Sequence, residues 1–183
     1  MLTPTQQVPL KAAILADPIL AAQPMNSDGH FAVAAAMNVT AVPDFWVWNP
    51  TVSVAEIMGN GFAWDRVDNA SVGKARIWEW MTTLVTLNAS AANVRSGILQ
   101  AFPAAGDLAM RLGIFSHCAR PASRVEKLLI TSGAGTVSTD QGVGPATMGF
   151  VGPISIDDVE AARLSCHDSG GRSVGTGCGM AGW

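Results

Sequence analysis

The hydrophobic and polar positions of this chain recur mostly with the period of an α-helix. The clearest segment is 72–87, where Ser71 stands at the capping position and large apolar residues such as Trp78 return every helical turn. The chain opens in the same way, because Thr3 and Gln6 have the spacing of a capping box. These patterns predict a helix near the start of the chain and a longer one in its middle.

Similar start signals occur along most of the sequence, each a capping residue followed by an apolar periodic run. They predict further helices that begin after Asn26, Ser53, Asn88, Asp107, Ser123 and Ser155. The fold class is therefore predicted to be mainly α, as a compact helical bundle with a short β or extended element and with long loop and C-terminal arms.

Three segments depart from this pattern. Residues 44–48 alternate bulky side chains on both faces, which indicates an extended segment buried on two sides. Residues 132–153 form a glycine-rich loop with a brief strand near Thr147. The stretch 165–183 is rich in glycine and serine and predicts a C-terminal arm held by another subunit or protein. We therefore expect a helical domain over 1–164 and an arm over 165–183.

Composition makes the chain unusually apolar. Of its 183 residues 49% are hydrophobic and only 14% are charged, whereas about 25% is usual. This excludes a disordered, solvating protein. The net charge of −3 argues against a protein whose main task is to bind nucleic acid.

The sequence also sets expectations about compartment. No apolar run approaches the length of a membrane span, and no secretory signal pattern is visible, so we expect no membrane partner. The cysteines Cys118, Cys166 and Cys178 are odd in number and widely spaced, which favours a reducing compartment over a disulfide framework.

No motif declares a chemistry. The serine-hydrolase elbow is missing, and the glycine pairs at 133–135 and 142–144 lack the lysine or third glycine of a phosphate loop. His30 and His117 have no catalytic context, and the adjacent His/Cys pairs at 117–118 and 166–167 are too far apart for a usual zinc site. We therefore expect no enzyme, no catalytic residues, no cofactor and no metal.

Tryptophan is frequent, with six copies and no tyrosine. Trp78 and Trp80 stand two apart on one predicted helix and cannot share a face, so one of them points away from the core. Because large aromatic residues serve both cores and interfaces, the two roles stay open. The interface candidates are Trp46, Trp48, Trp78, Trp80 and Trp183.

Several strings resemble a family of small structural proteins of tailed bacteriophages, of the head-to-tail connector or adaptor type. They are Leu2–Gln6, Asn26–Gly29, Val72–Met81, Arg124–Leu129 and Pro145–Ser155, and the similarity covers residues 2–164. The stretch 165–183 departs from the family pattern, so its role is not carried by the resemblance.

The resemblance implies a non-enzymatic virion protein, assembled in the host cytoplasm. It implies a ring of about twelve copies that joins the phage portal protein to tail or nozzle proteins and lets DNA pass. DNA in the channel or an acidic partner would then face Arg95, Arg111, Arg120, Arg124 and Lys127 through weak, non-specific contacts. Alternatively, these five basic side chains lie on helix faces that are exposed to solvent, where charged residues are expected without any partner.

Two other functions remain open from the sequence. One is another virion component, either a capsid-cementing or a tail-completion protein. The other is a small metal-dependent or hydrolytic enzyme.

Overall fold

The computed structural model describes residues 1–59 and 62–165. About 54% of these residues are helical, so the chain is mainly α, as the sequence predicts. Contacts divide the chain into two compact units. Unit 1 consists of Met1–Val42, Ser123–Leu129 and the described residues from Gly149 on, and unit 2 of Pro43–Ala122 and Ile130–Met148. The sequence pattern predicts a single helical domain over 1–164, whereas the contacts separate two units.

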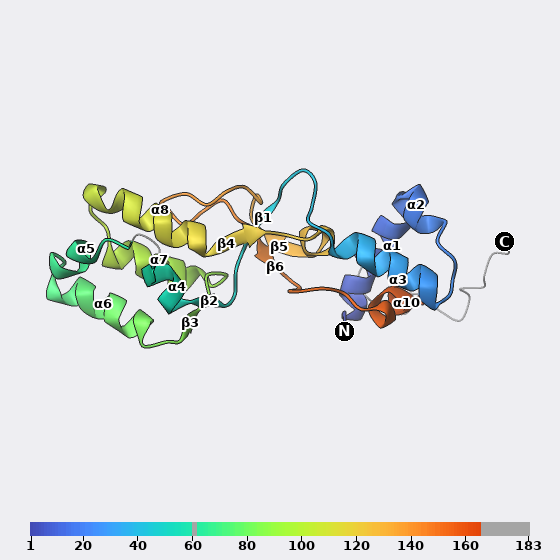
Figure 1. The fold of residues 1–183 in the computed structure, drawn as a ribbon, viewed down its shortest axis with the longest axis horizontal. Helices are drawn as coiled ribbons and strands as arrows, with labels where there is room; N and C mark the ends of the chain where they lie inside the picture. Colours follow the sequence, from blue (N-terminus) through green and yellow to red (C-terminus); the bar gives the residue numbers. More distant parts are fainter. Residues whose placement is uncertain (60–61, 166–183) are drawn as a thin grey trace. The chain divides into compact units, whose positions relative to one another are not determined.

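Unit 1 is built from five helices (Figure 1). They are α1 (Pro4–Ala16), α2 (Pro18–Ala21), α3 (Ser27–Asn38), α9 (Arg124–Leu128) and α10 (Ile156–Leu164). Their shared core is aliphatic and includes Leu10, Ile14, Val33, Val125 and Val159, each no more than 1% exposed. Because α1, α3 and α10 pack together, this core joins segments from both ends of the sequence.

Capping boxes define where three of these helices begin. Thr3 caps α1, Ser123 caps α9 and Ser155 caps α10, in each case with a reciprocal side chain three residues later. The predicted starts of these helices are confirmed. The helix α9 is short, because the chain leaves it at Leu129 and enters a strand at Ile130.

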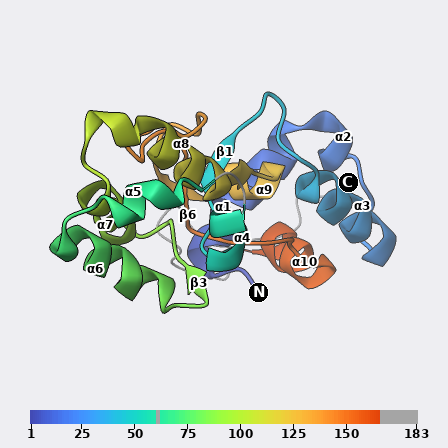
Figure 2. The same ribbon diagram turned by 60° about the vertical axis from the view of Figure 1, so that its left-hand side comes forward.

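Unit 2 holds the remaining elements, which Figure 2 shows from a second direction. Its helices are α4 (Val54–Gly59), α5 (Trp64–Asp68), α6 (Val72–Thr82), α7 (Ala92–Ala101) and α8 (Leu108–His117), with a short 3₁₀ turn at Ala105–Asp107. Its strands are β1 (Trp46–Trp48), β2 (Val52–Ser53), β3 (Thr86–Leu87), β4 (Ala119–Pro121), β5 (Ile130–Ser132) and β6 (Thr147–Met148).

The helix α6 ends at Thr82, five residues before the predicted end. Thr82 Oγ1 donates to the Glu79 carbonyl and Thr83 Oγ1 to the Trp80 carbonyl, so hydroxyls take up the last helical carbonyl groups. The chain then enters β3, which pairs antiparallel with β2. A side-chain cap and a strand partner distant in sequence thus override the helical period.

The strand β1 confirms the extended segment predicted at 44–48. It pairs antiparallel with β4, and Val47 forms a parallel bridge with Ala146 on its other side. Val47 and Trp48 are buried, whereas Trp46 is only partly buried. The predicted burial on two sides therefore holds for the centre of the segment.

The glycine-rich loop lies against its own unit. Thr136 and Thr139 donate backbone hydrogen bonds to Gly144 and Val143, so the loop closes on itself as a hairpin. Gly135 has a φ of 73°, and a Cβ there would overlap the Phe45 ring, so glycine alone fits this close approach. The resemblance to adaptor proteins implies an arm at residues 132–146 that reaches a partner. The packing instead makes residues 133–146 part of the fold of unit 2.

The predicted C-terminal arm, 165–183, lies outside the described residues apart from Ser165. Among the described residues, no helix is both long and apolar enough to cross a lipid bilayer.

Candidate interaction surfaces

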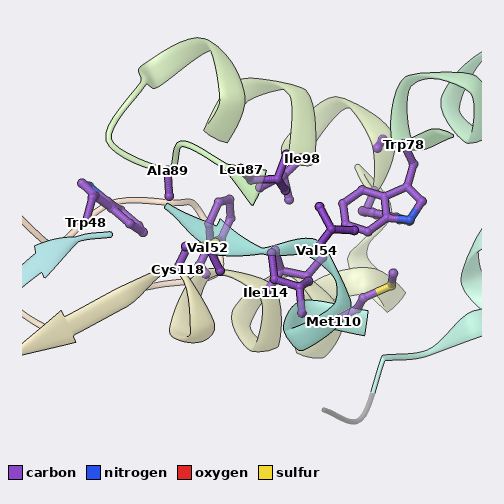
Figure 3. Close-up of a cluster of buried hydrophobic side chains, with 14 residues drawn as sticks. Trp48, Val52, Val54, Trp78, Leu87, Ala89, Ile98, Met110, Ile114 and Cys118 are labelled. Atoms are coloured by element: carbon purple, nitrogen blue, oxygen red, sulfur yellow. The ribbon is translucent and has the colours of Figure 1, made fainter. Parts of the chain in front are cut away.

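Two of the tryptophans predicted as interface anchors belong to the core of unit 2. Trp48 is 2% exposed and Trp78 is 3% exposed. Figure 3 shows them at opposite ends of one cluster of buried side chains. Trp78 packs edge to face on Phe102 at 5.1 Å between ring centroids, and Trp48 on Phe115 at 6.1 Å. Neither ring presents a surface to another protein, which corrects their assignment as interface candidates.

Trp80 has the opposite environment. It lies two residues after Trp78 on the same helix and is 64% exposed. The sequence prediction that one of this pair points away from the core therefore agrees with the structure. Trp46 is partly buried as the first residue of β1, and Trp183 lies outside the described residues.

A further exposed tryptophan, Trp64, was not among the sequence candidates. It is 56% exposed and begins α5, a five-residue helix that has no buried side chain. Its ring packs edge to face on Phe62, which in turn stacks on the buried Trp78 at 5.3 Å. No local pattern in the sequence marks Trp64 as exposed, since the equally short helix α9 buries Val125.

Trp80 belongs to an apolar strip that we call the α6 surface, defined by Val72, Trp80, Leu84 and Val85. Each of these side chains is at least 54% exposed. Val72 and Trp80 lie on one side of α6 with Arg76 between them at four-residue spacing, and Leu84 and Val85 follow the end of the helix. The α6 surface therefore places an aromatic ring and three aliphatic side chains in water.

Unit 1 carries its own exposed apolar side chains. Leu15 and Ile19 are 64% and 73% exposed near the junction of α1 and α2. On α3, Phe31 and Val39 are 62% and 53% exposed. Phe31 also lines a groove of about 440 Å³ between α3 and the start of α10.

Two of the five basic candidates already serve the packing of unit 2. The guanidinium of Arg95 lies 4.9 Å from the centre of the Trp48 ring and donates to the carbonyl groups of Ala89 and Ser90. Burial of Arg95 lowers its pKa from the usual value. Arg95 is therefore committed to contacts within its own unit.

Arg111 is 6% exposed and fastens the glycine-rich loop to α8. Its guanidinium donates to the carbonyl groups of Phe102 and Ala104, and it pairs with the Asp140 carboxylate at 3.0 Å. The hydrogen bond from Arg111 holds the pKa of Asp140 below its usual value. Arg111 is thus a structural clamp rather than a free cation facing a channel.

The other three basic candidates are also only partly exposed. Arg120, in unit 2, donates to the Pro121 carbonyl and contacts the Met148 sulfur. Arg124 and Lys127 are in unit 1, where Arg124 pairs with Asp17 at 3.2 Å. The hydrogen bond from Arg124 lowers the pKa of Asp17. The five residues therefore divide between two units, and each of the four arginines has a contact within its own unit.

The candidate metal donors do not converge in the described part of the chain. Across residues 1–59 and 62–165, no three His, Cys, Asp or Glu side chains gather in a way that would hold a metal ion. Cys118 is fully buried, and burial raises the pKa of its thiol to about 12. Cys166 and Cys178 lie outside the described residues.

His30 is the buried histidine of α3. It is 4% exposed, and its Nε2 atom has no hydrogen-bond partner. The side chain is packed inside unit 1, with no acid or nucleophile shown within hydrogen-bond reach of Nε2, so the arrangement has no nucleophile–base pair.

Comparison of the chain with models of protein families, with curated proteins and with solved structures gives no match.

Proposed function

We propose that this protein is a non-enzymatic virion structural protein, a subunit of the adaptor ring that joins the head of a tailed bacteriophage to its tail. The observation that carries the proposal is the exposure of large apolar side chains on both units. Nineteen large hydrophobic residues of the described chain are at least 36% exposed, among them Trp64 and Trp80. A ring of identical copies would cover such side chains.

Scattered apolar side chains are normal on protein surfaces, so their grouping matters more than their number. The α6 surface belongs to unit 2. The exposed apolar side chains of unit 1 include the pair Leu15 and Ile19 and the pair Phe31 and Val39. A closed ring needs two different complementary patches on each copy, because every contact is heterologous. Apolar groups on two separate units meet that requirement.

The low charge of the chain supports the same proposal. Permanent interfaces between identical subunits are more apolar than ordinary surfaces, and this chain has 14% charged residues and a mean hydropathy of +0.28. The resemblance of residues 2–164 to connector proteins then supplies the position in the particle. The proposed partners are further copies of the chain, the portal protein and the tail or nozzle proteins.

The finer features remain part of the proposal. They are the compact helical bundle, the docking of the arm 165–183 on a neighbour and the transient passage of DNA through the ring. Because Arg95 and Arg111 are committed to contacts inside unit 2, the proposal gives them no role in contacting DNA.

The test is the assembly state of the purified full chain, by native mass spectrometry and by electron microscopy of negatively stained particles. We expect a closed ring of identical copies. Trp80→Ser should weaken assembly, whereas Asn93→Ser, a change at an exposed position of α7 outside the α6 surface, should leave it intact. A chain that stays monomeric with and without portal protein contradicts the proposal. If the protein were instead found on the icosahedral capsid lattice, or at a six-fold symmetric position of the phage particle, it would be another virion component.

A further inference from the structure

The groove of unit 1 is a preformed apolar depression. Phe31 and Ala35 of α3 form one wall, and Ile154 and Ile156 form the other. Asn38 ties the two walls together, because its side chain donates to the Ile154 carbonyl and accepts from the Ile154 backbone N–H, at 3.0 and 2.9 Å. A group that enters the groove therefore has no rearrangement of these walls to drive.

The size of this groove suits one large aromatic ring. Its volume is about 440 Å³, whereas a cavity of about 150 Å³ already holds a benzene molecule. Ala34 and Ala35 are among the lining residues, and their small side chains let a flat ring approach α3 closely. Aromatic side chains set in pockets are the groups that contribute most to contacts between proteins.

The edge of the groove is acidic. Asp157 lines it, and Asp28 and Glu160 stand one turn away from lining residues on α3 and α10. All three carboxylates are exposed. Across residues 1–59 and 62–165, none of them forms an ion pair. A cation brought to this edge would therefore displace no existing partner.

The α6 surface of unit 2 carries the opposite charge at its centre. Val72, Arg76 and Trp80 follow one another at four-residue spacing, so Arg76 lies between two exposed apolar side chains. Glu79 is also exposed, but it is turned about 100° from Trp80 around the helix. The Trp80 ring, which is 64% exposed, is the largest side chain of this surface.

Arg76 differs from the other arginines of unit 2. Each of those has an ion pair or a hydrogen bond within the unit: Arg66, Arg95, Arg111 and Arg120. In the part of unit 2 that the structure describes, Arg76 has neither and is exposed. Its guanidinium is therefore available to carboxylates on another molecule.

We propose that the Trp80 ring of one copy enters the unit 1 groove of the next copy, with Arg76 paired to the carboxylates at the rim. The inference rests on the proposed function and names which surface of one copy meets which surface of its neighbour. The contact is heterologous, because the ring comes from unit 2 and the groove from unit 1. It also covers Phe31, which is 62% exposed in the single chain.

The test uses two full-length variants, each defective at one of the two surfaces. Trp80→Glu places a carboxylate opposite the acidic rim, and Phe31→Lys places a cation opposite Arg76. Both positions are exposed, so the helicity of each variant should match that of the wild-type chain by circular dichroism. Sedimentation equilibrium should show each variant alone as a monomer of 19.0 kDa, at concentrations where the wild-type chain assembles.

An equimolar mixture of these two variants should form a 1:1 dimer that grows no further. One intact α6 surface and one intact groove meet in this dimer, and only the two defective surfaces remain. A mixture of Trp80→Glu with Val72→Glu contains no intact α6 surface and should stay monomeric. Asn93→Glu, the same kind of change at an exposed position of α7, should assemble as the wild-type chain does.

A charge exchange tests the pairing of Arg76 with Asp157. Arg76→Glu should weaken association about tenfold, and Asp157→Arg in the same chain should recover most of that loss. Asp44→Arg makes the same change at an exposed carboxylate outside both surfaces and should recover nothing. Equal recovery by the two changes would reveal an effect of net charge alone and would contradict the pairing.

Rings that form equally well with Trp80→Glu or Phe31→Lys would overturn the inference and leave the proposed function standing. A mixture of these two variants that stays monomeric would also overturn it, because the two surfaces would then not meet each other. Open chains of copies, broken by the same variants, would contradict the closed adaptor ring and leave this contact standing. A wild-type chain that is monomeric at every concentration would contradict both.

Discussion

The two units of this chain are stabilised by different chemistry. Unit 1 has an aliphatic core, and short acidic side chains fasten its helices: Glu126 and Asp158 cap α9 and α10 and also bind backbone N–H groups distant in sequence. Unit 2 has a core rich in large aromatic rings, and Arg95 and Arg111 tie its loops to that core. Unit 1 is thus fastened by the buried carboxylates of Glu126 and Asp158, and unit 2 by the buried guanidinium of Arg111 and the partly buried guanidinium of Arg95.

Tryptophan makes this comparison measurable. All described tryptophans belong to unit 2, so their fluorescence reports that unit once Trp183 is replaced by phenylalanine. Far-UV circular dichroism reports the helices of both units. A change confined to one unit should therefore separate the two unfolding curves.

The largest effect is expected for Trp78→Ala. The side chain is 3% exposed and packs on Phe62 and Phe102, so its removal leaves a cavity in the aromatic core. We expect a loss of about 3–5 kcal/mol from the free energy of unfolding of unit 2, measured by urea unfolding followed by fluorescence. Unit 1, followed by amide hydrogen exchange of α10, should keep its stability. Equal loss in both units would show that they unfold as one.

Arg111→Met should have the next largest effect. The change removes the guanidinium that donates to the Phe102 and Ala104 carbonyl groups and pairs with the Asp140 carboxylate, which should destabilise unit 2 by about 2–3 kcal/mol. Amide exchange should also accelerate across residues 136–144. Arg76→Met, at an exposed position of α6, serves as control and should change neither quantity. Retained protection of 136–144 in the Arg111 variant would contradict the role of this clamp.

Unit 1 offers the corresponding change at Glu126, which is 2% exposed. Glu126→Ala removes the acceptor for the backbone N–H groups of Ser123 and Gly152, with an expected loss of about 2 kcal/mol. Faster amide exchange in α9 and α10, with unchanged tryptophan fluorescence, is the predicted signature. A change in tryptophan fluorescence would show that Glu126→Ala alters unit 2, which would contradict the predicted role of Glu126 in unit 1.

A smaller effect is expected from acid. Burial alone would raise the pKa of Asp158, but hydrogen bonds donated by Ser155 and Leu2 outweigh it and lower the pKa below 3.8. A lowered pKa in the folded state means that the carboxylate stabilises unit 1 above the unfolded pKa, and that this contribution is lost as the pH falls through the folded pKa. Stability of unit 1 should therefore fall below about pH 4. Asp158→Asn should flatten that dependence, and an unchanged acid profile would refute this account.

Much of this fold is local enough to predict from the sequence. The starts of α1, α9 and α10 follow from capping boxes, which involve residues only three apart. The early end of α6 could not be predicted, since β3 depends on pairing with β2 more than thirty residues away. The division into two units also depends on contacts between residues distant in sequence, because α9 and α10, which follow α8 along the chain, pack with the N-terminal helices in unit 1.

The candidate surfaces were predictable only in part. Two-residue spacing showed that one of Trp78 and Trp80 leaves the core, but packing on Phe62 and Phe102 decides which. The basic candidates illustrate the limit more sharply. A cation–π contact with Trp48 and an ion pair with Asp140 across the glycine-rich loop leave no local pattern in the sequence.

The smallest effect on stability is expected for Trp80→Ala, the counterpart of the first change. Because this ring is 64% exposed, its loss should alter the free energy of unfolding by no more than about 0.5 kcal/mol. Urea unfolding followed by fluorescence is again the measurement. A loss as large as that of Trp78→Ala would show that Trp80 supports the core and would remove it from the α6 surface.

The central claim is that exposed apolar groups on both units make this chain a subunit of a larger assembly. Its most direct test is the mass of the purified full-length protein in solution, by light scattering across a dilution series. We predict a single large species whose mass is a whole multiple of 19.0 kDa and persists on dilution. A particle of 19.0 kDa at every concentration, indifferent to portal and tail proteins, would contradict the claim.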